Sequence, residues 1–277
     1  MGLRISTNIA SLAVQRNLKE TTGAAQDQLE KLSSGKRITK AADDAAGLAI
    51  GTNLRAQTRG INQAARNAND GISLIQTAEG GLSETSNILI RLRELSVQAA
   101  SDTVGAQERQ LLDNEYQQLT TEINRISQST VFNGTSLLDG KGGGSLDFQV
   151  GAFAGEQNII RFDTGGTDAS AASIGVEGSS ITEKSSALSS IASVDSALNS
   201  ISGFRAKLGS IQTRLKSTVN NLETQALNQE AARSVIEDVD VAQATAKLAS
   251  ASIINSAGVT TLAQANAIPN NALRLIN

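Results

Sequence analysis

Residues 194–222 read VDSALNSISGFRAKLGSIQTRLKSTVNNL, and an apolar residue recurs in this stretch every seven positions. The residues on this seam are Val194, Leu198, Ile201, Leu208, Leu215 and Leu222. Heptad spacing of this kind is typical of a long helix that packs against another helix along one stripe. At about 1.5 Å per residue, a helix over residues 185–228 would span roughly 65 Å, and a helix that long needs partners along its length.

Apolar residues at alternating spacings of four and three also occur elsewhere in the chain, where they predict further helices. They are Ile5, Ile9 and Leu12, then Ala25, Leu29 and Leu32 near the N-terminus; Ile88, Leu92, Leu95 and Ala99, then Leu112, Tyr116, Leu119, Ile123 and Ile126 in the middle; and Val235, Val239, Ala242, Ala246, Ala249 and Ile253 near the C-terminus. A polar turn over residues 101–105 separates the two middle helices, so we expect these two to pack antiparallel.

Glycines are expected to interrupt the helices of the N-terminal half, because glycine is a poor helix former. Gly23 and residues 33–35 predict a break and a restart in the first helix. Gly47 and Gly51 weaken the next helix, and residues 79–81, Glu-Gly-Gly, are the next expected break.

The stretch from residue 130 to residue 180 differs from the rest, since it holds four of the six aromatic residues and many glycines. SLDFQVGAFAGEQNIIRFDT alternates in polarity and predicts a β-hairpin with strands near 146–150 and 158–163. Asn133-Gly134 is a strong turn signal. The Ser-, Gly- and Thr-rich sequence that follows, to about residue 182, predicts a loop.

Composition narrows the classes of function. The formal charge is −3, from 24 basic and 27 acidic residues, which gives no electrostatic reason to expect a nucleic-acid ligand. The chain has no histidine and no cysteine, so thiol nucleophiles, imidazole catalysis and His/Cys metal sites are excluded, and no cofactor is expected. No stretch approaches 18 consecutive apolar residues, so no membrane span is expected, and the N-terminus lacks the apolar core of a secretory signal peptide.

Asp43 and Asp44 are adjacent carboxylates that follow Lys40 at the start of an alanine-rich run. They fit the first turn of a helix, where carboxylates accept backbone N–H bonds and oppose the helix dipole. A catalytic dyad would need a further group to separate the two pKa values, and the sequence offers none. The structural interpretation is therefore preferred.

The two ends of the chain mirror each other, since each predicts a long amphipathic helix without a globular core of its own. The simplest arrangement pairs the first helix with the last. The predicted fold is mainly α, a long antiparallel helical bundle or coiled-coil rod with a small β-hairpin insertion. The predicted parts are a terminal coiled-coil domain of residues 1–43 and 236–277, a helical rod domain of residues 44–130 and 182–235, and a hairpin and loop part of residues 131–181.

Several stretches resemble the bacterial flagellins. They are LSSGKRITKAADDAAGLAI, RNANDGISLIQTAEGGLSE, IRLRELSVQAA, INRISQSTVFNGTSLLDG and, near the C-terminus, LAQANAIPNNALRLIN. The resemblance follows the order of the family's motifs and covers about residues 1–164 and 185–277. Because little sequence remains between the two halves, the chain looks like a compact flagellin without large variable outer domains.

The resemblance implies a structural subunit, and no enzyme, that self-assembles into the extracellular flagellar filament used for swimming. In the family, the terminal helices form the innermost tube of the filament, and subunits are exported unfolded through the flagellar type III apparatus. The partners implied are other copies of the chain, an export chaperone, hook-associated proteins and the filament cap.

Subunit packing is predicted for the apolar residues of the two termini, because an amphipathic helix without a core can be completed by neighbouring subunits. The residues are Leu3, Ile5, Ile9, Leu12, Leu262, Leu273, Leu275 and Ile276. The alternative is that these residues pair within one chain.

Some flagellins are recognised by a Toll-like innate immune receptor. Matching the family motif places Arg91, Leu95 and Glu115 in the recognition surface. Spacing alone gives a different interpretation, in which Leu95 is a seam residue and Arg91 and Glu115 are solvated or interfacial charges.

Three other functions fit part of the sequence. A hook–filament junction protein shares similar terminal helices, but NDGISLIQTAEGGL and FNGTSLLDG favour the main filament subunit. An enzyme with a catalytic outer domain would need more room than the β insertion gives. A coiled-coil secretion needle would explain the heptads but not the order of the motifs.

Overall fold

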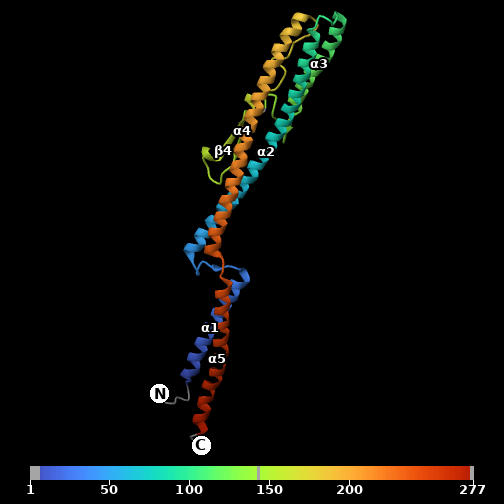
Figure 1. The fold of residues 1–277 in the computed structure, drawn as a ribbon. Helices are drawn as coiled ribbons and strands as arrows, with labels where there is room; N and C mark the ends of the chain where they lie inside the picture. The colour runs from blue at the N-terminus through green and yellow to red at the C-terminus, as the bar shows by residue number, and fades with distance from the viewer. Residues whose placement is uncertain (1–6, 142–143, 275–277) are drawn as a thin grey trace. The chain divides into compact units, whose positions relative to one another are not determined.

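The computed structural model describes residues 7–141 and 144–274, and the chain is mainly α-helical, as predicted (Figure 1). The helices in this part are α1 (Ile9–Ser34), α2 (Ala45–Ala99), α3 (Ala106–Ser129), α4 (Lys184–Glu237) and α5 (Val241–Arg274). The strands are β1 (Val131–Phe132), β2 (Thr135–Ser136), β3 (Ser145–Gln149) and β4 (Ile159–Asp163), with short 3-10 turns at Glu156–Asn158 and Gly165–Thr167.

The chain divides into two compact units. Unit 1 comprises Met1–Ala56 and Asn228–Asn277, and unit 2 comprises Gln57–Leu227. Helices α2 and α4 therefore contribute residues to both units, whereas α1 and α5 belong to unit 1 and α3 and both hairpins belong to unit 2. The division into three parts that the sequence predicts stays a prediction.

The heptad seam of α4 lies in the core of unit 2, as its spacing predicts. Val194, Ile201, Leu208 and Leu215 are all buried there. The buried residues that α2 and α3 contribute to the same core are Ala68, Leu74, Ile75, Ala78, Leu82, Leu89, Leu92, Leu95, Ala99, Tyr116 and Ile123. The predicted seams of these three helices are thus confirmed.

Both hairpins are antiparallel, and the sequence predicted their positions well. Strands β3 and β4 pair from Ser145 opposite Asp163 to Gln149 opposite Ile159, within a residue or so of the predicted strands. Between β1 and β2, Asn133 has φ 48° and Gly134 has φ 80°. Positive φ at both central residues is what a type I′ two-residue hairpin turn requires, so the turn interpretation of Asn-Gly is confirmed.

The segment from residue 164 to residue 182 has no long helix or strand, as predicted, but it is packed into the core of unit 2. Ala171 and Ile181 are fully buried in it. The side chains of α3 satisfy its backbone: Oδ1 of Asn124 accepts from the N–H of Ala171, and Oδ1 of Asp113 accepts from that of Ile181, each at 2.8 Å. This loop is therefore a structural layer over α3.

The prediction that glycines break the helices is wrong at Gly23, which lies inside α1, and at residues 79–81, which lie inside α2. Several α2 glycines instead give other segments room to approach. A Cβ at Gly71 would lie 3.1 Å from the ring of Phe148, and a Cβ at Gly81 would lie 2.8 Å from Cδ1 of Leu138. The cost of glycine in a helix is here offset by close packing of the β3–β4 hairpin and of the segment after β2.

Candidate assembly surface

Helices α1 and α5 lie side by side in unit 1 and run antiparallel (Figure 1). Nδ2 of Asn8 donates to the carbonyl oxygen of Ala265, and Oγ of Ser11 donates to Oδ1 of Asn266, each at 2.7 Å. Further along, Leu18 packs so closely that a Cβ on Gly258 would lie 3.1 Å from its Cδ1. The predicted pairing of the two terminal helices is confirmed for these residues.

The seam between the two helices follows a regular heptad pattern but contains mainly small or polar side chains. Its buried and half-buried residues are Ser11, Val14, Leu18, Thr21, Ala25, Gln28 and Leu32 on α1, and Ala244, Leu248, Ala251, Asn255, Gly258, Leu262 and Ala265 on α5. Among the described residues of these helices, the most buried are Ser11, Ala244, Ala251 and Ala265. Small residues bring the helices close together but remove little apolar area from water.

Eight of the large apolar residues of these two helices face outward. They are 48–69% exposed: Ile9, Leu12, Leu29, Val241, Ile253, Ile254, Val259 and Ile268. Scattered exposed apolar residues are normal on a protein surface, but so many on two paired helices indicate an interaction surface. We call this set the outward apolar residues.

The seam predicted for the C-terminal helix is therefore wrong. A break at residues 238–240 separates α4 from α5, so Val235 and Ile253 belong to different helices. Ala242, Ala246, Ala249 and Ile253 are all exposed. Each terminal helix has apolar residues on more than one stripe, and spacing alone does not say which stripe finds its partner within the chain.

The eight residues predicted to pack between subunits have different positions. Ile9 and Leu12 are exposed on α1, whereas Leu262 is half-buried on the seam that faces α1. Leu273 is in α5, but its side chain lies outside the described part of the structure. Leu3, Ile5, Leu275 and Ile276 lie outside the described residues. Ile254, Val259 and Ile268 of α5 are also exposed, and they lie off the stripe that the spacing selected.

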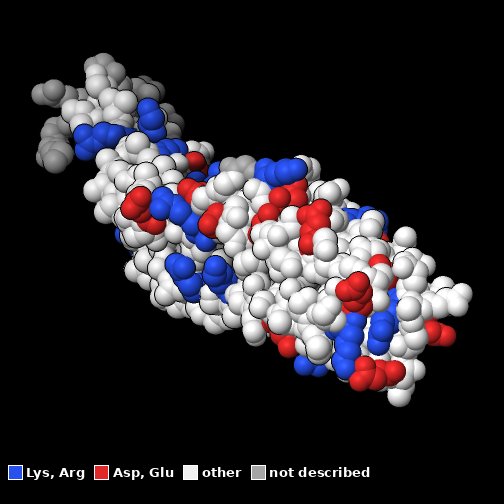
Figure 2. Space-filling view, turned by 90° about the horizontal axis from the view of Figure 1, so that it is seen from above, with Lys and Arg blue, Asp and Glu red and all other residues white. Residues whose placement is uncertain are grey.

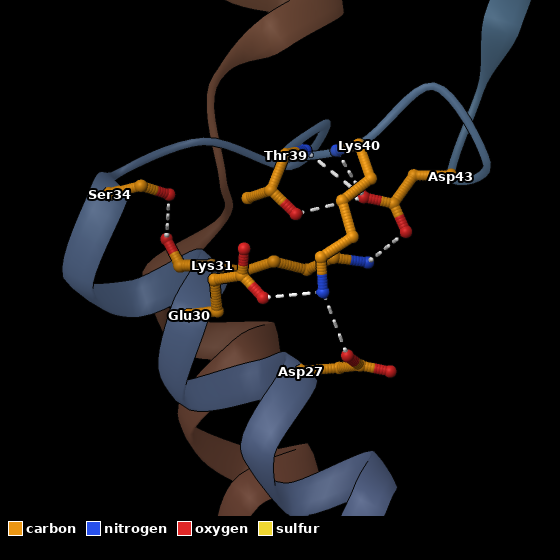
Figure 3. A network of polar contacts seen from close by, with 7 residues as sticks. All are labelled: Asp27, Glu30, Lys31, Ser34, Thr39, Lys40 and Asp43. Carbon is orange, nitrogen blue, oxygen red and sulfur yellow. Dashed lines mark hydrogen bonds and ion pairs between the residues drawn. The ribbon is translucent and has the colours of Figure 1, made fainter.

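The paired aspartates hold the connection between α1 and α2, and Figure 3 shows the contacts of Asp43. Oδ2 of Asp43 accepts from the N–H and hydroxyl of Thr39, each at 3.0 Å, and from the N–H of Lys40 at 3.1 Å. Oδ1 of Asp44 accepts from the N–H of Gly47 at 2.8 Å and caps α2. The helix-start interpretation is confirmed for Asp44, whereas Asp43 lies before α2 and binds the loop that precedes it. The described residues contain no group of three or more acidic, His or Cys side chains that could hold a metal ion.

Basic side chains complete this network (Figure 3). Nζ of Lys40 lies 2.6 Å from Oε2 of Glu30 and 3.7 Å from Oδ1 of Asp27, and Nζ of Lys31 lies 3.6 Å from Oδ1 of Asp43. The N–H groups of Thr39 and Lys40, and then the Thr39 hydroxyl and the Lys31 charge, lower the pKa of Asp43 to about 2. The carboxylate is thus fully charged at neutral pH and ties the loop to the end of α1.

The same loop is joined to the break between α4 and α5. The N–H of Arg37 donates to the carbonyl oxygen of Glu237 at 2.7 Å, and the N–H of Val239 donates to that of Gly35 at 3.0 Å. Glu237 is 3% exposed, and its Oε2 accepts from Nη2 of Arg55 at 2.8 Å. Since Gly51 has no side chain, Glu237 fits beside α2 there. These contacts join the loop before α2, and α2 itself, to the segment just before α5.

The three residues predicted for receptor recognition lie on α2 and α3 of unit 2. Nη2 of Arg91 lies 2.8 Å from Oε1 of Glu115, and its Nη1 lies 3.0 Å from Oε2 of Glu94. These contacts raise the pKa of Arg91, with Glu115 the larger cause. Leu95 is fully buried in the core. Of the three, only Arg91 and Glu115 therefore offer surface to a partner, and recognition itself stays a prediction.

The charged surface is mixed in sign. Figure 2 shows acidic and basic side chains interspersed on one face, with uncharged surface between them. None of the helices in the described part combines the length and the apolar character that crossing a membrane requires.

Comparison with known proteins relates both halves of the chain to one family. The model of the bacterial flagellin N-terminal helical region matches residues 5–142, and that of the bacterial flagellin C-terminal helical region matches residues 191–276. The flagellin of Halalkalibacterium halodurans is 43% identical over 272 residues, which cover 98% of this chain and 99% of the relative. The flagellin of Bacillus subtilis is 41% identical, with 99% and 100% covered.

Two solved structures of flagellar proteins are also similar to this chain. The flagellin of Bacillus cereus is 32% identical with a TM-score of 0.51, over 61% of this chain and 94% of that one. A putative flagellar hook-associated protein of Vibrio parahaemolyticus has a TM-score of 0.58 over 70% of this chain and 99% of that one. It is only 14% identical, so the likeness is one of fold alone.

Proposed function

The chain belongs to the bacterial flagellin family, and we propose that it joins its neighbours in the filament through the outward apolar residues of α1 and α5. Its function is that of a structural subunit that self-assembles into the flagellar filament used for swimming. The filament is extracellular. The family is one of structural proteins, and the junction-protein alternative has weaker support, because the flagellin relatives match nearly the full length at over 40% identity.

The observation that carries the proposal is the arrangement of large and small side chains on the terminal helices. Small residues such as Ala244 and Ala251 face the partner helix, whereas Ile9, Leu12 and Ile253 face outward. An amphipathic helix in a self-sufficient pair would bury its large apolar residues. Burying one isoleucine or leucine completely is worth about 1.5–3 kcal/mol, and these side chains have roughly half of their surface left to bury, so several of them together favour assembly.

We further propose that the free subunit loses helix at both ends and regains it on assembly. The seam between α1 and α5 buries little apolar area, and helices without sufficient tertiary contacts are marginal in water. Ordering the ends would consume part of the contact energy, as in other cases of folding coupled to binding.

The test is polymerisation of variants of the outward apolar residues. Leu12→Ser and Ile253→Ser should each raise the critical concentration about 10- to 100-fold, since about 1.4 kcal/mol corresponds to tenfold. Gln243→Ser, at an exposed polar position of α5, is the matched control and should change it little. Removal of residues 1–10 should abolish polymerisation. Normal filaments from the truncated chain, or from the Leu12 and Ile253 variants, would refute the proposal.

The partners beyond the chain itself are proposed from the family alone. They are a flagellar export chaperone, the hook-associated proteins and the filament cap, and export would follow the flagellar type III route. Recognition by a Toll-like receptor is proposed through Arg91 and Glu115. If the same surface contacts neighbouring subunits, a receptor would bind the free subunit and not the filament.

A further inference from the structure

Asn133 and Gly134 form the two-residue turn between β1 and β2, and they lie at the surface of unit 2. Both residues are exposed, and a Cβ added to Gly134 would meet no other atom within 4 Å. Nowhere else in the chain is an asparagine followed directly by glycine. This turn is therefore the one place where the backbone nitrogen after an asparagine belongs to a residue without a side chain.

An asparagine in this sequence context can lose its side-chain amide. The backbone nitrogen of the next residue attacks Cγ, so that a C–N bond forms, the Cγ–Nδ2 bond breaks, and ammonia leaves with the proton of the attacking N–H. Water then opens the five-membered ring at one of its two carbonyl groups. One opening gives aspartate, and the other gives isoaspartate, whose backbone is one carbon longer. Glycine favours the attack because it has no Cβ to crowd the nitrogen.

The folded turn holds the attacking nitrogen away from this carbon. Asn133 has φ 48° and Gly134 has φ 80°, both in the left-handed region. In the left-handed conformation ψ is about +47°, which places the nitrogen of the next residue nearly opposite Cβ across the Cα–C bond. Ring closure needs the two atoms on the same side of that bond. Asn133 must therefore leave its turn conformation before its side chain can react.

The segments on both sides of the turn resist such an opening. Strands β1 and β2 pair over two residues each. Directly beyond them, the N–H of Leu137 donates to the carbonyl oxygen of Thr130 at 3.1 Å, and Oγ of Ser127 donates to that of Leu138 at 2.8 Å. Leu137 and Leu138 are fully buried in the core of unit 2. Because opening works against these contacts, the turn is closed in most folded chains at any moment.

We propose that Asn133 is a deamidation site that records how long the chain has been unfolded. The unfolded chain loses the amide, and the closed hairpin suppresses this loss. The rate in the folded chain equals the rate in the open turn multiplied by the fraction of chains whose turn is open. A tenfold protection corresponds to an opening free energy of about 1.4 kcal/mol, within the range of local openings in folded proteins. The site goes beyond the proposed function, since it does not depend on filament formation.

The two products have different effects on a chain that folds afterwards. Aspartate, like asparagine, is tolerated in the left-handed conformation, so this product keeps the turn. Isoaspartate adds a backbone carbon to a loop of only two residues, and the type I′ geometry is lost. Since Leu137 directly follows β2, the disturbance reaches the core of unit 2. Time spent unfolded therefore leaves a lasting defect in the hairpin.

Time-resolved mass spectrometry of the full chain tests the site. The chain is incubated at mildly alkaline pH, either unfolded in guanidinium chloride or folded in sodium chloride at the same concentration, and its peptides are analysed for deamidation and isoaspartate. Residue 133 should deamidate at least about tenfold faster in the unfolded chain. Asn124 and Asn158 precede Arg125 and Ile159 and serve as internal controls, which should change little in either state.

A variant opens the turn without denaturant. Thr135→Pro removes a backbone donor of β2 and disfavours the turn conformation of Gly134, while the Asn-Gly pair stays in place. Circular dichroism should show intact helices, and deamidation of the folded variant should rise toward the rate of the unfolded chain. Val131→Thr, at an exposed position of β1, is the matched control and should behave like wild type.

Three results would overturn the proposal. They are equal rates at residue 133 in the folded and unfolded wild-type chain, no deamidation there in the unfolded chain, and a folded Thr135→Pro variant that deamidates no faster than wild type. If Thr135→Pro does not fold, the comparison of folded and unfolded wild type decides. Filament growth enters neither measurement, so the proposed function is tested separately.

Discussion

At the scale of single residues, Asp43 shows how a short motif fixes the connection between two long helices. Its carboxylate binds three donors from Thr39 and Lys40, and its partner Asp44 caps α2. The sequence predicted the role of Asp44, whose donor lies three residues on in the first turn of α2, but not the contacts of Asp43 with the preceding loop. Asp113 and Asn124 hold the buried loop in a similar way, but their partners lie 68 and 47 residues away. No local pattern could have identified those two.

Asp43 makes the stability of unit 1 depend on pH. Its pKa of about 2 in the folded chain lies below the ordinary value of 3.8, so its contribution is complete above about pH 4 and is lost as the pH falls toward 2. We expect Asp43→Asn to lower the melting temperature of filaments by a constant amount between pH 7 and pH 5, and the difference should narrow between pH 4 and pH 2.5.

Circular dichroism of both filaments across this range measures the effect. Thr39→Val, which removes one donor to Asp43, should give an intermediate loss at neutral pH. A difference between wild type and Asp43→Asn that stays constant down to pH 2.5 would contradict the assignment.

At the scale of helices and strands, the sequence predicted where the helices lie better than which side of each helix is buried. Heptads identified α2, α3 and α4 and their buried seams, because those seams are the main apolar stripes of these helices. On α1 and α5 many of the large apolar residues lie on other stripes, since the seam within the chain mixes leucines with small and polar residues. The glycines of α2 misled for a related reason, because their effect depends on hairpins that pack on them from elsewhere in the chain.

The contact between Leu18 and Gly258 tests the α1–α5 seam. An added Cβ at Gly258 would lie 3.1 Å from Cδ1 of Leu18, so Gly258→Leu should force the helices apart and destabilise unit 1 by about 1–3 kcal/mol. Leu18→Ala in the same chain should recover part of that loss, since it vacates the space that the new side chain needs. Thermal unfolding of the two single variants and the double variant measures the coupling. Strictly additive effects would mean that these residues do not touch in the assembled protein.

At the scale of the whole molecule, the chain consists of two units that differ in how complete they are. Unit 2 has a core that extends over three helices, two hairpins and a packed loop. In unit 1, many large apolar residues of the terminal helices face outward. The sequence predicted only part of this difference between the two units. The sequence predicted terminal helices without a core, but the surface left for neighbours depends on which stripe the intrachain pair uses.

Growth from short filament seeds, followed by sedimentation and helical circular dichroism together, tests most directly whether neighbouring subunits complete the terminal helices. Long filaments whose appearance coincides with rising helicity are the predicted result, because α1 and α5 would gain their missing contacts as each subunit adds. A soluble monomer that is already fully helical and never extends the seeds would contradict the account.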